Sequence, residues 1–138
     1  MAVGLNPYLT LPGTAAQAVA FYADVFGGTP EVMTFGDAGA EGAPPEQVMH
    51  ASLRTDQGFV LMLSDTPPGA PPAGAGNVAV SLSGDDLEVL RGWWARLSEG
   101  GTVTVPMERQ VWGDEFGACL DRFGVSWMVD AATGEQPG

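Results

Sequence analysis

The sequence predicts an α+β fold built from two βαβββ modules, and three observations support this prediction. Segments of alternating apolar and polar residues, typical of half-buried strands, are interspersed with segments of helical period. Gly and Pro cluster between them, in 36–45, in 67–76 and after residue 133, as expected of loops. The same order of elements then occurs twice along the chain. We therefore expect two curved mixed sheets, each backed by one helix, that together form a cleft.

The first half of the chain carries the pattern of one complete module. Residues Asn6–Leu11 alternate as a strand does, and Thr14 is placed to cap a helix over Ala15–Phe26. Gly27 and Gly28 follow, and such a pair commonly ends a helix. Three further strands are expected at Glu31–Phe35, Gln47–Thr55 and Gly58–Ser64.

The second half repeats this order of elements. Residues Asn77–Leu82 alternate like the first strand, and Asp85 or Asp86 is placed to cap a helix that ends at Gly100-Gly101. A shift of 71 residues brings similar residues together, which indicates an internal repeat, with chance periodicity in a chain rich in small residues as the alternative. The matched pairs are Asn6 with Asn77, Leu11 with Leu82, Gly13 with Gly84, Tyr22 with Trp93, and Val32 with Val103. The strands expected after the second helix are Val103–Met107, Glu115–Asp121 and Val125–Asp130.

A Pro- and Gly-rich segment divides one predicted domain, residues 1–138, into its two modules. Module one covers about 5–66, the linker 67–76 and module two about 77–132, and a flexible tail follows at 133–138. The chain has a mass of 14.3 kDa and 45% hydrophobic residues, which is enough to bury a core.

The charge of the chain excludes several classes of partner. Five Lys and Arg residues against 17 Asp and Glu give a formal net charge of −12, which disfavours nucleic acid and anionic membranes. A neutral or cationic small ligand is compatible with this charge. Cys119 is the single cysteine, which excludes an intramolecular disulfide and fits a reducing compartment. No apolar run approaches the roughly 20 residues of a membrane span, and we expect a soluble cytoplasmic protein.

The two faces of the predicted strands differ in composition. On the side expected to face a helix, the alternating residues are all apolar, as at Leu9, Leu11 and Val78. The opposite residues, among them Val48, form a mixed set that is too polar for a packed core and too apolar for a bare surface. Such a face is typical of a small-molecule site, with a simple solvated face as the alternative. The candidate ligand-binding residues are Asn6, Tyr8, His50, Ser52, Ser64, Asn77, Ser81, Trp112 and Met128.

His50 is the only histidine and the one candidate catalytic residue. It is either a structural histidine, hydrogen-bonded by Ser52, Asn6 or Asn77, or a group that transfers a proton in the cleft. Cys119 lies in an apolar strand without a nearby cation, so we expect it to be buried and unreactive. Trp112 lies in a Gly-flanked loop, where it covers a ligand, anchors an interface or packs locally.

Six motifs, taken in order, resemble those of a known superfamily. The chain is similar to the PhnB-like branch of the glyoxalase/bleomycin-resistance/extradiol-dioxygenase superfamily, which has the vicinal oxygen chelate fold. The resemblance spans Asn6 to Asp130 and implies paired βαβββ modules that form a cleft, commonly completed in a homodimer. The motifs are Asn6-Pro-Tyr-Leu, Phe21-Tyr with Val25-Phe-Gly-Gly28, Val48-Met-His-Ala-Ser-Leu53, Leu61-Met-Leu-Ser-Asp65, Trp112-Gly113 with Phe116-Gly117, and Asp121-Arg-Phe-Gly-Val-Ser-Trp127.

The resemblance also implies where the metal-using relatives would hold a divalent ion. The ligand positions fall on Asn6, His50, Asn77 and Met128, and the ion would act as a Lewis acid on vicinal oxygens of a substrate. Only His50 is a good ligand, because Met128 offers a soft thioether and the asparagines offer amide oxygens. We therefore expect no metal and no other cofactor.

Three functions remain open from the sequence. We expect a metal-independent small-molecule binding protein that sequesters an aromatic or cationic natural product, as bleomycin-resistance proteins do. The alternatives are a metal-dependent lyase or dioxygenase-like enzyme of the glyoxalase type, and a metal-free enzyme that uses His50. A methyltransferase is not supported, since the sequence has no Gly-rich cofactor fingerprint.

Overall fold

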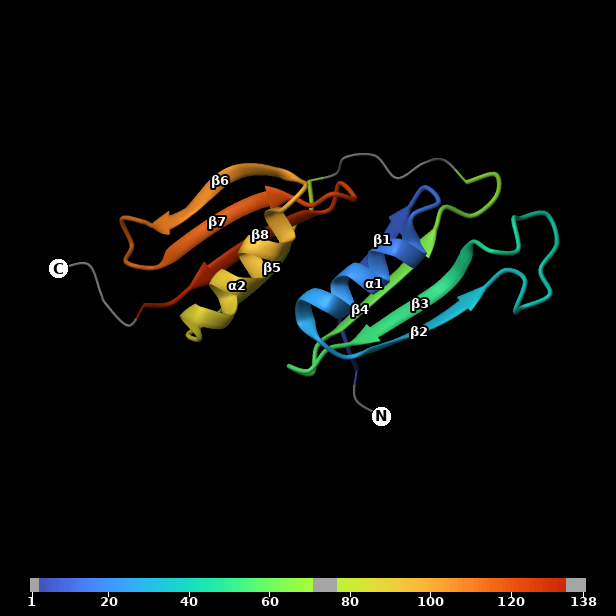
Figure 1. Cartoon of the computed structure of the whole chain (residues 1–138), viewed down its shortest axis with the longest axis horizontal. Coiled ribbons are helices and arrows are strands. Elements are labelled where there is room, and N and C mark those ends of the chain that lie inside the picture. Colours follow the sequence, from blue (N-terminus) through green and yellow to red (C-terminus); the bar gives the residue numbers. More distant parts are fainter. Residues whose placement is uncertain (1–2, 71–76, 134–138) are drawn as a thin grey trace. The chain divides into compact units, whose positions relative to one another are not determined.

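The computed structural model describes residues 3–70 and 77–133 of the chain (Figure 1). Most of the linker predicted at 67–76 and of the tail predicted at 133–138 therefore lies outside the described residues. The elements of the first half are β1 Tyr8–Leu11, α1 Ala15–Phe26, β2 Thr29–Thr34, β3 Val48–Arg54 and β4 Val60–Asp65. Those of the second half are β5 Val80–Gly84, α2 Leu87–Ser98, β6 Thr102–Arg109, β7 Glu115–Leu120 and β8 Ser126–Ala131.

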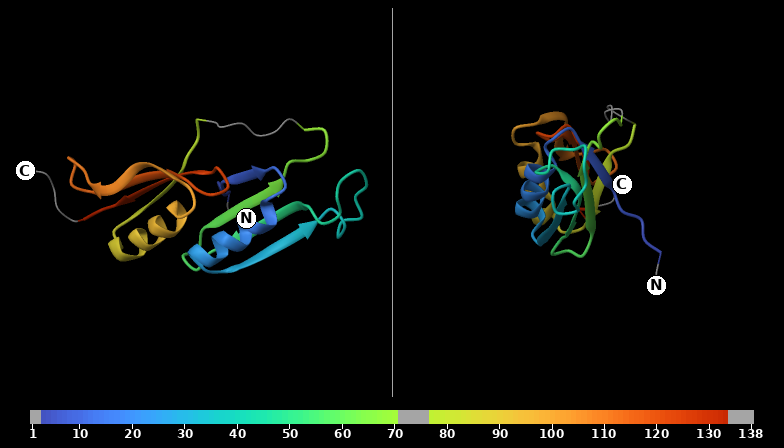
Figure 2. Two further views of the ribbon diagram at one scale, coloured as in Figure 1. Left: turned by 45° about the horizontal axis from the view of Figure 1, so that its top comes forward. Right: turned by 90° about the vertical axis from the view of Figure 1, so that its right-hand side faces the viewer.

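Each half forms one four-stranded mixed sheet backed by one helix, which confirms the predicted α+β fold of two βαβββ modules (Figures 1 and 2). The strand order is β1-β4-β3-β2 in the first sheet and β5-β8-β7-β6 in the second. In each sheet the first and last strands pair in parallel, and the other neighbours pair antiparallel. The helix carries the chain from one edge strand to the opposite edge, so it covers a single face of its sheet.

Contacts between residues divide the chain into two compact units, 1–76 and 77–138, and each unit contains one of the sheets. That the two modules act as one domain stays a prediction. Neither helix in the described part of the chain has the length and apolar character needed to cross a bilayer.

The first strand of each module is shorter than the alternating pattern predicts. β1 begins at Tyr8 rather than at Asn6, and β5 begins at Val80 rather than at Asn77. Residue-by-residue pairing begins only at these points, although Pro7 O still accepts a hydrogen bond from the Met62 amide of β4 at 3.1 Å, and pairing rather than periodicity sets where a strand starts. Val78, which the alternation places under a helix, is therefore 80% exposed.

The number of residues between equivalent positions in the two modules is not the same for the first strands as for the helices. Leu11 and Leu82, 71 residues apart, are both buried on the helix side of their sheets. The helices begin at Ala15 and Leu87, which are 72 residues apart. Because the strand-to-helix link is one residue longer in the second module, Tyr22 corresponds to Trp94 and not to Trp93 as the single shift predicted.

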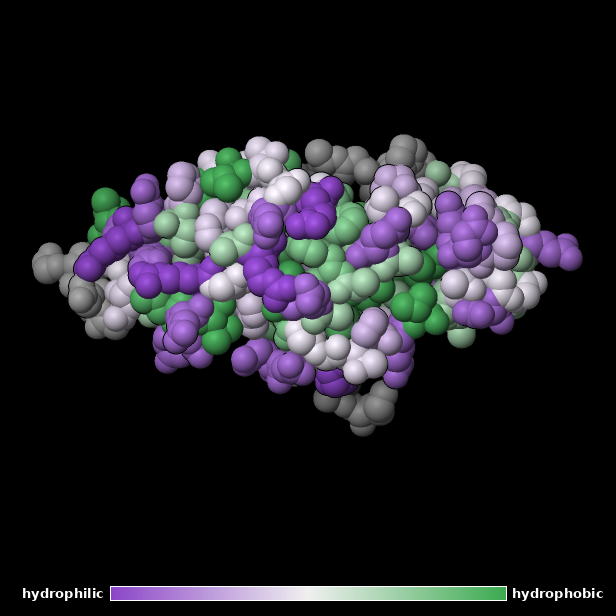
Figure 3. Space-filling view, in the orientation of Figure 1, coloured by the Kyte–Doolittle hydropathy of each residue, from purple (hydrophilic) through white to green (hydrophobic). Residues whose placement is uncertain are grey.

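The outer surfaces of the two helices differ in polarity. α1 buries Tyr22 and Phe26 against its sheet, and its exposed positions combine the small apolar Ala16 and Ala20 with Gln17 and Asp24, so part of its outer surface is apolar (Figure 3). α2 instead exposes charged residues such as Arg91, and Figure 3 shows hydrophilic residues over it. A solvated helix needs only one apolar stripe, and α2 has that pattern more clearly than α1.

Tryptophans fill the helix side of the second sheet, as the sequence predicted for Trp94 and Trp127. Trp127 of β8 is completely buried, and its indole Nε1 donates a hydrogen bond to Asp121 Oδ2 at 2.8 Å. Trp94 of α2 lies against Gly117 of β7, where an added Cβ would come within 3.0 Å of the ring atom Cζ3. Glycine at this position therefore lets the indole approach the backbone of the sheet.

A β-bulge in β3 corrects the predicted position of Val48. His50 pairs with Met33, but the next paired position is Val48 with Thr34, so Met49 is the extra residue. The bulge shifts the alternation by one residue and turns Val48 to the helix side, where it is completely buried. The sequence pattern had placed Val48 on the mixed face.

A buried carboxylate organises each module. Asp65, at the end of β4, accepts hydrogen bonds from the backbone amides of Ala15 at 2.9 Å and Val48 at 2.8 Å. It thereby caps α1 from a distant strand, while the side chain of the predicted cap, Thr14, makes no capping hydrogen bond. In the second module Asp121 holds the β7–β8 turn and Trp127, because its carboxylate accepts from the amides of Phe123 and Val125 and from the indole Nε1 of Trp127.

Replacing Asp65 by alanine should strongly destabilise the protein. The Asp65→Ala variant leaves two backbone amides without an acceptor, and we expect the free energy of unfolding to fall by about 2–4 kcal/mol. Asp85→Ala removes an exposed carboxylate and should change that free energy by less than about 0.5 kcal/mol. Urea unfolding followed by circular dichroism measures both, and equal stabilities of the two variants would contradict this role of Asp65.

Candidate functional site

The single helix of each described module covers one face of its sheet, and we call the opposite surfaces the open face of module one and the open face of module two. Strand register decides which residues belong to each, since paired residues point to the same side. The open face of module one carries Tyr8 and Thr10 on β1, Val60, Met62 and Ser64 on β4, His50, Ser52 and Arg54 on β3, and Thr29, Glu31 and Met33 on β2.

Tyr8 and His50 form the aromatic part of the open face of module one. The Tyr8 hydroxyl lies 3.3 Å from His50 Nδ1, and the two rings stack with centroids 5.8 Å apart. Both side chains are exposed, Tyr8 at 51%. From the sequence we expected Ser52, Asn6 or Asn77 to bond to His50, but the structure gives it a different partner, Tyr8. An exposed imidazole held by a phenol can exchange a hydrogen bond with a ligand.

The other candidates of module one take different positions. Ser52 lies on the open face, beside Met62 of β4 and Glu31 of β2. Ser64 pairs with Thr10 on the same face and is only 5% exposed. Asn6 is exposed and precedes the first strand by two residues. The described structure thus brings Tyr8, His50 and Ser52 onto one accessible surface and leaves Asn6 outside the sheet.

A shallow groove of about 210 Å³ lies on the open face of module one, near the end of β3. Its lining is mostly polar, with charged and hydroxyl side chains and Val60 as the one apolar residue, so it would contact the polar part of a ligand. Its charged residues were not among the candidates from the sequence. The two-residue period nevertheless includes them, since Glu31 lies two residues before Met33 and Arg54 two residues after Ser52. The lining residues are Thr29, Glu31, Ser52, Arg54 and Val60.

The open face of module two carries two of the predicted residues, Ser81 and Met128. Ser81 of β5 pairs with Met128 of β8, so these two candidates lie side by side. Asn77 is exposed and lies three residues before β5 begins. The remaining members of this face are Ser83, Thr102, Val105, Glu108, Phe116, Ala118, Leu120, Ser126 and Asp130.

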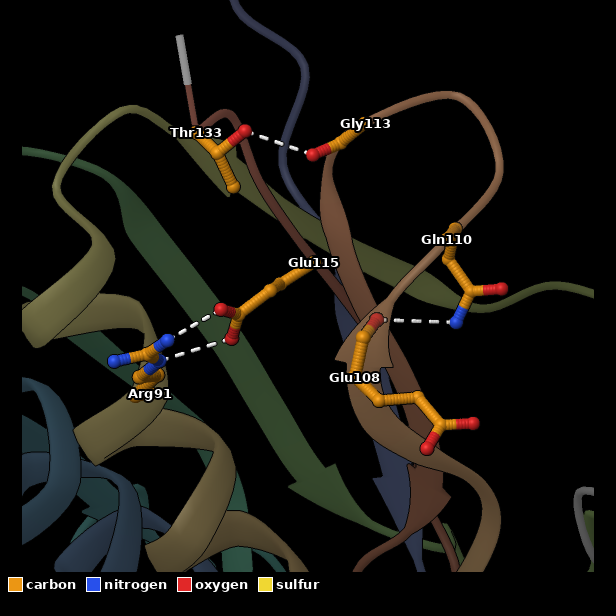
Figure 4. A network of polar contacts seen from close by, with 6 residues as sticks. All are labelled: Arg91, Glu108, Gln110, Gly113, Glu115 and Thr133. Atoms are coloured by element: carbon orange, nitrogen blue, oxygen red, sulfur yellow. Dashed lines mark hydrogen bonds and ion pairs between the residues drawn. The ribbon is translucent and has the colours of Figure 1, made fainter. Parts of the chain in front are cut away.

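Trp112 lies in a tight turn between β6 and β7 that is fixed at several points. The backbone N–H of Gln110 donates to Asp114 O at 2.8 Å. Figure 4 shows two further hydrogen bonds, from Gln110 Nε2 to Glu108 O at 3.1 Å and from the Thr133 hydroxyl to Gly113 O at 2.7 Å. Just beyond the turn, Glu115 forms an ion pair with Arg91 of α2 (Figure 4). The indole is 47% exposed, and its ring meets Phe116 edge-on at a centroid distance of 6.0 Å. A partly exposed tryptophan on such a turn presents a fixed apolar surface.

A pair of carboxyl groups beside Trp112 was missed by the sequence analysis. Asp130 lies on the open face of module two, paired with Phe116. Its pKa is raised by burial and by the hydrogen bond and negative charge of Asp114, and a hydrogen bond with Trp112 opposes this rise. Asp130 is two residues beyond Met128, so the two-residue period alone could have placed it on this face.

Cys119 is not part of either open face. It is 1% exposed on the helix side of β7, where it pairs with Trp127. Burial, with the charge of Asp121, raises the pKa of its thiol to about 11. The thiol is therefore protonated at neutral pH, which agrees with the predicted unreactive cysteine.

The donor atoms at the implied ligand positions do not suit a divalent metal ion. His50 supplies one imidazole, already hydrogen-bonded to Tyr8, while Met128 supplies a thioether and the asparagines lie outside the strands. Among residues 3–70 and 77–133, no three His, Cys, Asp or Glu side chains come close enough to hold an ion. No step that runs through a metal is therefore derived for this chain.

The Asp130 carboxyl predicts a pH-dependent effect on stability. Because the folded state raises its pKa, protonation of Asp130 stabilises the native protein, and this stabilisation is lost as the pH rises through the raised pKa. Asp130→Asn imitates the protonated form, so the variant should melt a few degrees above the wild type at pH 8. The difference should shrink as the pH falls towards the ordinary value of 3.8.

Asp85→Asn, at an exposed aspartate, is the matched control, and its melting temperature should follow the wild type at every pH. Thermal unfolding between pH 4 and pH 8 provides the measurement. If the Asp130→Asn protein is less stable than the wild type at pH 8, the fold stabilises the charged form of Asp130, and the prediction is contradicted.

Known structures share this fold along nearly the whole chain. A crystal structure of protein PA1353 from Pseudomonas aeruginosa has 35% identity and a TM-score of 0.86, over 95% of this chain and 98% of that one. A PhnB protein from Bacillus cereus, described as a putative 3-demethylubiquinone-9 3-methyltransferase, has 19% identity and a TM-score of 0.78. Its match covers 94% of this chain and all of the other, and at this identity it shows the fold alone.

Sequence comparison gives the family. An uncharacterized protein of Mycobacterium bovis is 30% identical over 131 residues, which cover 91% of this chain and 80% of that protein. The model of the Glyoxalase/Bleomycin resistance protein/Dioxygenase superfamily matches residues 4–129. That match covers all of the first module and the second module as far as Val129 in β8, and the chain therefore belongs to the glyoxalase/bleomycin resistance protein/dioxygenase superfamily.

Proposed function

We propose that this chain is a metal-independent small-molecule binding protein that takes an aromatic or cationic natural product on its open faces. The observation that carries the proposal is the presence of fixed but accessible aromatic side chains, Tyr8 and Trp112, on surfaces that no helix covers. Aromatic side chains that remain half exposed gain apolar contact area when a planar ligand stacks on them.

In module one, the proposal is supported by the mixture of groups around Tyr8. The phenol and the imidazole of His50 form a stacked pair, so little conformational entropy is lost when a ligand packs against them. Met62 lies beside Tyr8 in the strand register and provides an adaptable apolar contact. Ser52 adds a hydroxyl that can donate or accept a hydrogen bond.

In module two, the charge around Trp112 favours a cationic ligand. The indole lies beside the Asp114 and Asp130 carboxyl groups, and Phe116 adds a second ring. A cation attracted by these carboxyl groups could also rest on the aromatic faces. The net charge of −12 would increase the local concentration of such ligands.

The metal-dependent alternative finds little support in the donor atoms. Catalysis by a glyoxalase or dioxygenase-like lyase needs several hard ligands around one ion, and Met128 and the two asparagines do not supply them. A metal-free enzyme is the second candidate, because the Tyr8 hydroxyl and His50 Nδ1 lie 3.3 Å apart and could relay a proton.

Within the superfamily we assign the chain to the PhnB-like branch, on the six sequence motifs. We further propose that the protein is a cytoplasmic homodimer. Its single cysteine supports a reducing compartment, because a protein with one thiol gains nothing from an oxidising one.

A thermal-shift screen tests the binding function. Cationic natural products, aromatic antibiotics and α-keto acids form the panel, and at least one aromatic or cationic compound should raise the melting temperature by mass action. Trp112→Ala or Tyr8→Ala should weaken binding of that compound by about tenfold or more, since each removes a stacking surface. Val111→Ala is the matched control, because Val111 is 90% exposed in the same turn.

Two results of the screen would count against the proposal. One is a panel in which only α-keto acids bind and His50→Ala abolishes their turnover, which favours the metal-free enzyme. The other is an aromatic ligand whose affinity is unchanged in both aromatic variants, which places its binding surface elsewhere.

Metal removal gives an independent test. Purified protein should contain less than about 0.1 equivalents of any transition metal per chain, and EDTA should leave the melting temperature unchanged within about 1 °C. Elemental analysis and a thermal scan measure these quantities. A stoichiometric metal that is lost in the His50→Ala variant would favour the metal-dependent enzyme instead.

A further inference from the structure

We propose that the groove on the open face of module one binds the charged end of a small zwitterion, a molecule that carries a carboxylate and an ammonium group as an α-amino acid does. The inference rests on the proposed binding function and names the chemistry of one part of its ligand. The groups that would recognise the zwitterion are the Arg54 guanidinium and the Glu31 carboxylate, which line the same groove.

Arg54 is the one positively charged side chain in an acidic half of the sequence. It is the only Lys or Arg among residues 1–76, a stretch that contains seven Asp and Glu residues: Asp24, Glu31, Asp37, Glu41, Glu46, Asp56 and Asp65. Despite this excess of carboxylates, the Arg54 side chain makes no ion pair or hydrogen bond with any described residue. The single cation of the module therefore keeps its donors available in a groove instead of using them to hold the fold.

The other polar groups of the groove are equally available. Within the described residues, the side chains of Thr29, Glu31 and Ser52 have no hydrogen-bond partner. Polar side chains that serve stability usually find partners inside the protein, as Asp65 and Asp121 do here. In the groove Thr29, Glu31 and Arg54 are exposed, so their donors and acceptors are hydrated and can exchange water for the polar groups of a ligand.

Strand register explains why both charges can contact one small molecule. Arg54 pairs with Thr29 and Glu31 pairs with Ser52, so the two charged residues are diagonal neighbours across β2 and β3. Diagonal neighbours in an antiparallel pair are about 7–8 Å apart at their Cα atoms. The guanidinium can hold a carboxylate by two parallel hydrogen bonds, and the Glu31 carboxylate can accept from an ammonium group beside it.

The surroundings of the groove fit an organic ligand with an apolar part. Val60 lines the groove, and Met62 is the next open-face residue along β4. The groove has a volume of about 210 Å³, which suits a molecule the size of one amino acid better than an inorganic ion. Beyond Met62 the face continues to Tyr8, where a ring of the same ligand could stack.

The test uses three probes with the same phenyl group: L-phenylalanine, 3-phenylpropionate without the ammonium group, and 2-phenylethylamine without the carboxylate. Titration of the ¹⁵N-labelled full chain should show saturable shifts of the Ser52 and Arg54 amides with L-phenylalanine, with a Kd in the millimolar range expected for about a dozen heavy atoms. The other two probes should bind at least about fivefold more weakly, because each loses one charge-assisted contact.

Variants identify the recognising groups. Arg54→Gln and Glu31→Gln should each weaken L-phenylalanine binding by about tenfold, and the spectrum of each variant shows whether the fold is retained. Arg96→Gln on α2 and Glu41→Gln in the β2–β3 loop are the matched controls and should bind as the wild type does.

Equal binding of 3-phenylpropionate and L-phenylalanine, or binding that survives both groove variants, would overturn the inference. So would the absence of any shift at the groove amides up to the solubility limit of L-phenylalanine. If these results came together with an aromatic hit that depends on Tyr8 or Trp112, the inference would fail while the proposed binding function stood.

Discussion

The structure depends on one constraint: a twelve-residue helix covers only one face of each four-stranded sheet. In a βαβββ module the helix must carry the chain from one edge strand to the other, so no second helix is available for the opposite face. The apolar side of each strand therefore lies under the helix, and the mixed side remains open. In this chain the side chains that can bind or react with a ligand lie on the open side, among them Tyr8, His50 and Asp130.

The covered and open sides also differ in how their charged groups are used. On the covered side, Asp65 and Asp121 are buried and accept hydrogen bonds from backbone amides or an indole, so these carboxylates hold elements together. On the open side, Arg54 and Glu31 have no partner among the described residues. Charged residues on the covered side therefore stabilise the fold, whereas those on the open side remain available to bind a ligand.

Periodicity and glycine placement predicted the element order, both helices and the assignment of Trp94 and Trp127 to the core. They could not predict the bulge at Met49, because a bulge depends on pairing with β2 and not on the composition of β3. The capping of α1 by Asp65 was equally hidden, since it joins residues 50 positions apart. At the candidate site the two-residue period placed Tyr8, His50 and Ser52 together on one face, but along β3 it was followed only from Val48 to Ser52, and so it passed over Arg54.

The central claim is that ligand contacts lie on the open faces, and methionine methyl NMR tests it most directly. Met62 and Met33 belong to the open face of module one and Met128 to that of module two, whereas Met107 approaches Gly117 on the helix side beneath Trp94. In ¹³C-methyl-labelled protein, a bound ligand should shift signals of open-face methionines and leave Met107 unchanged. A ligand that shifts Met107 while the three open-face signals stay fixed would contradict the account.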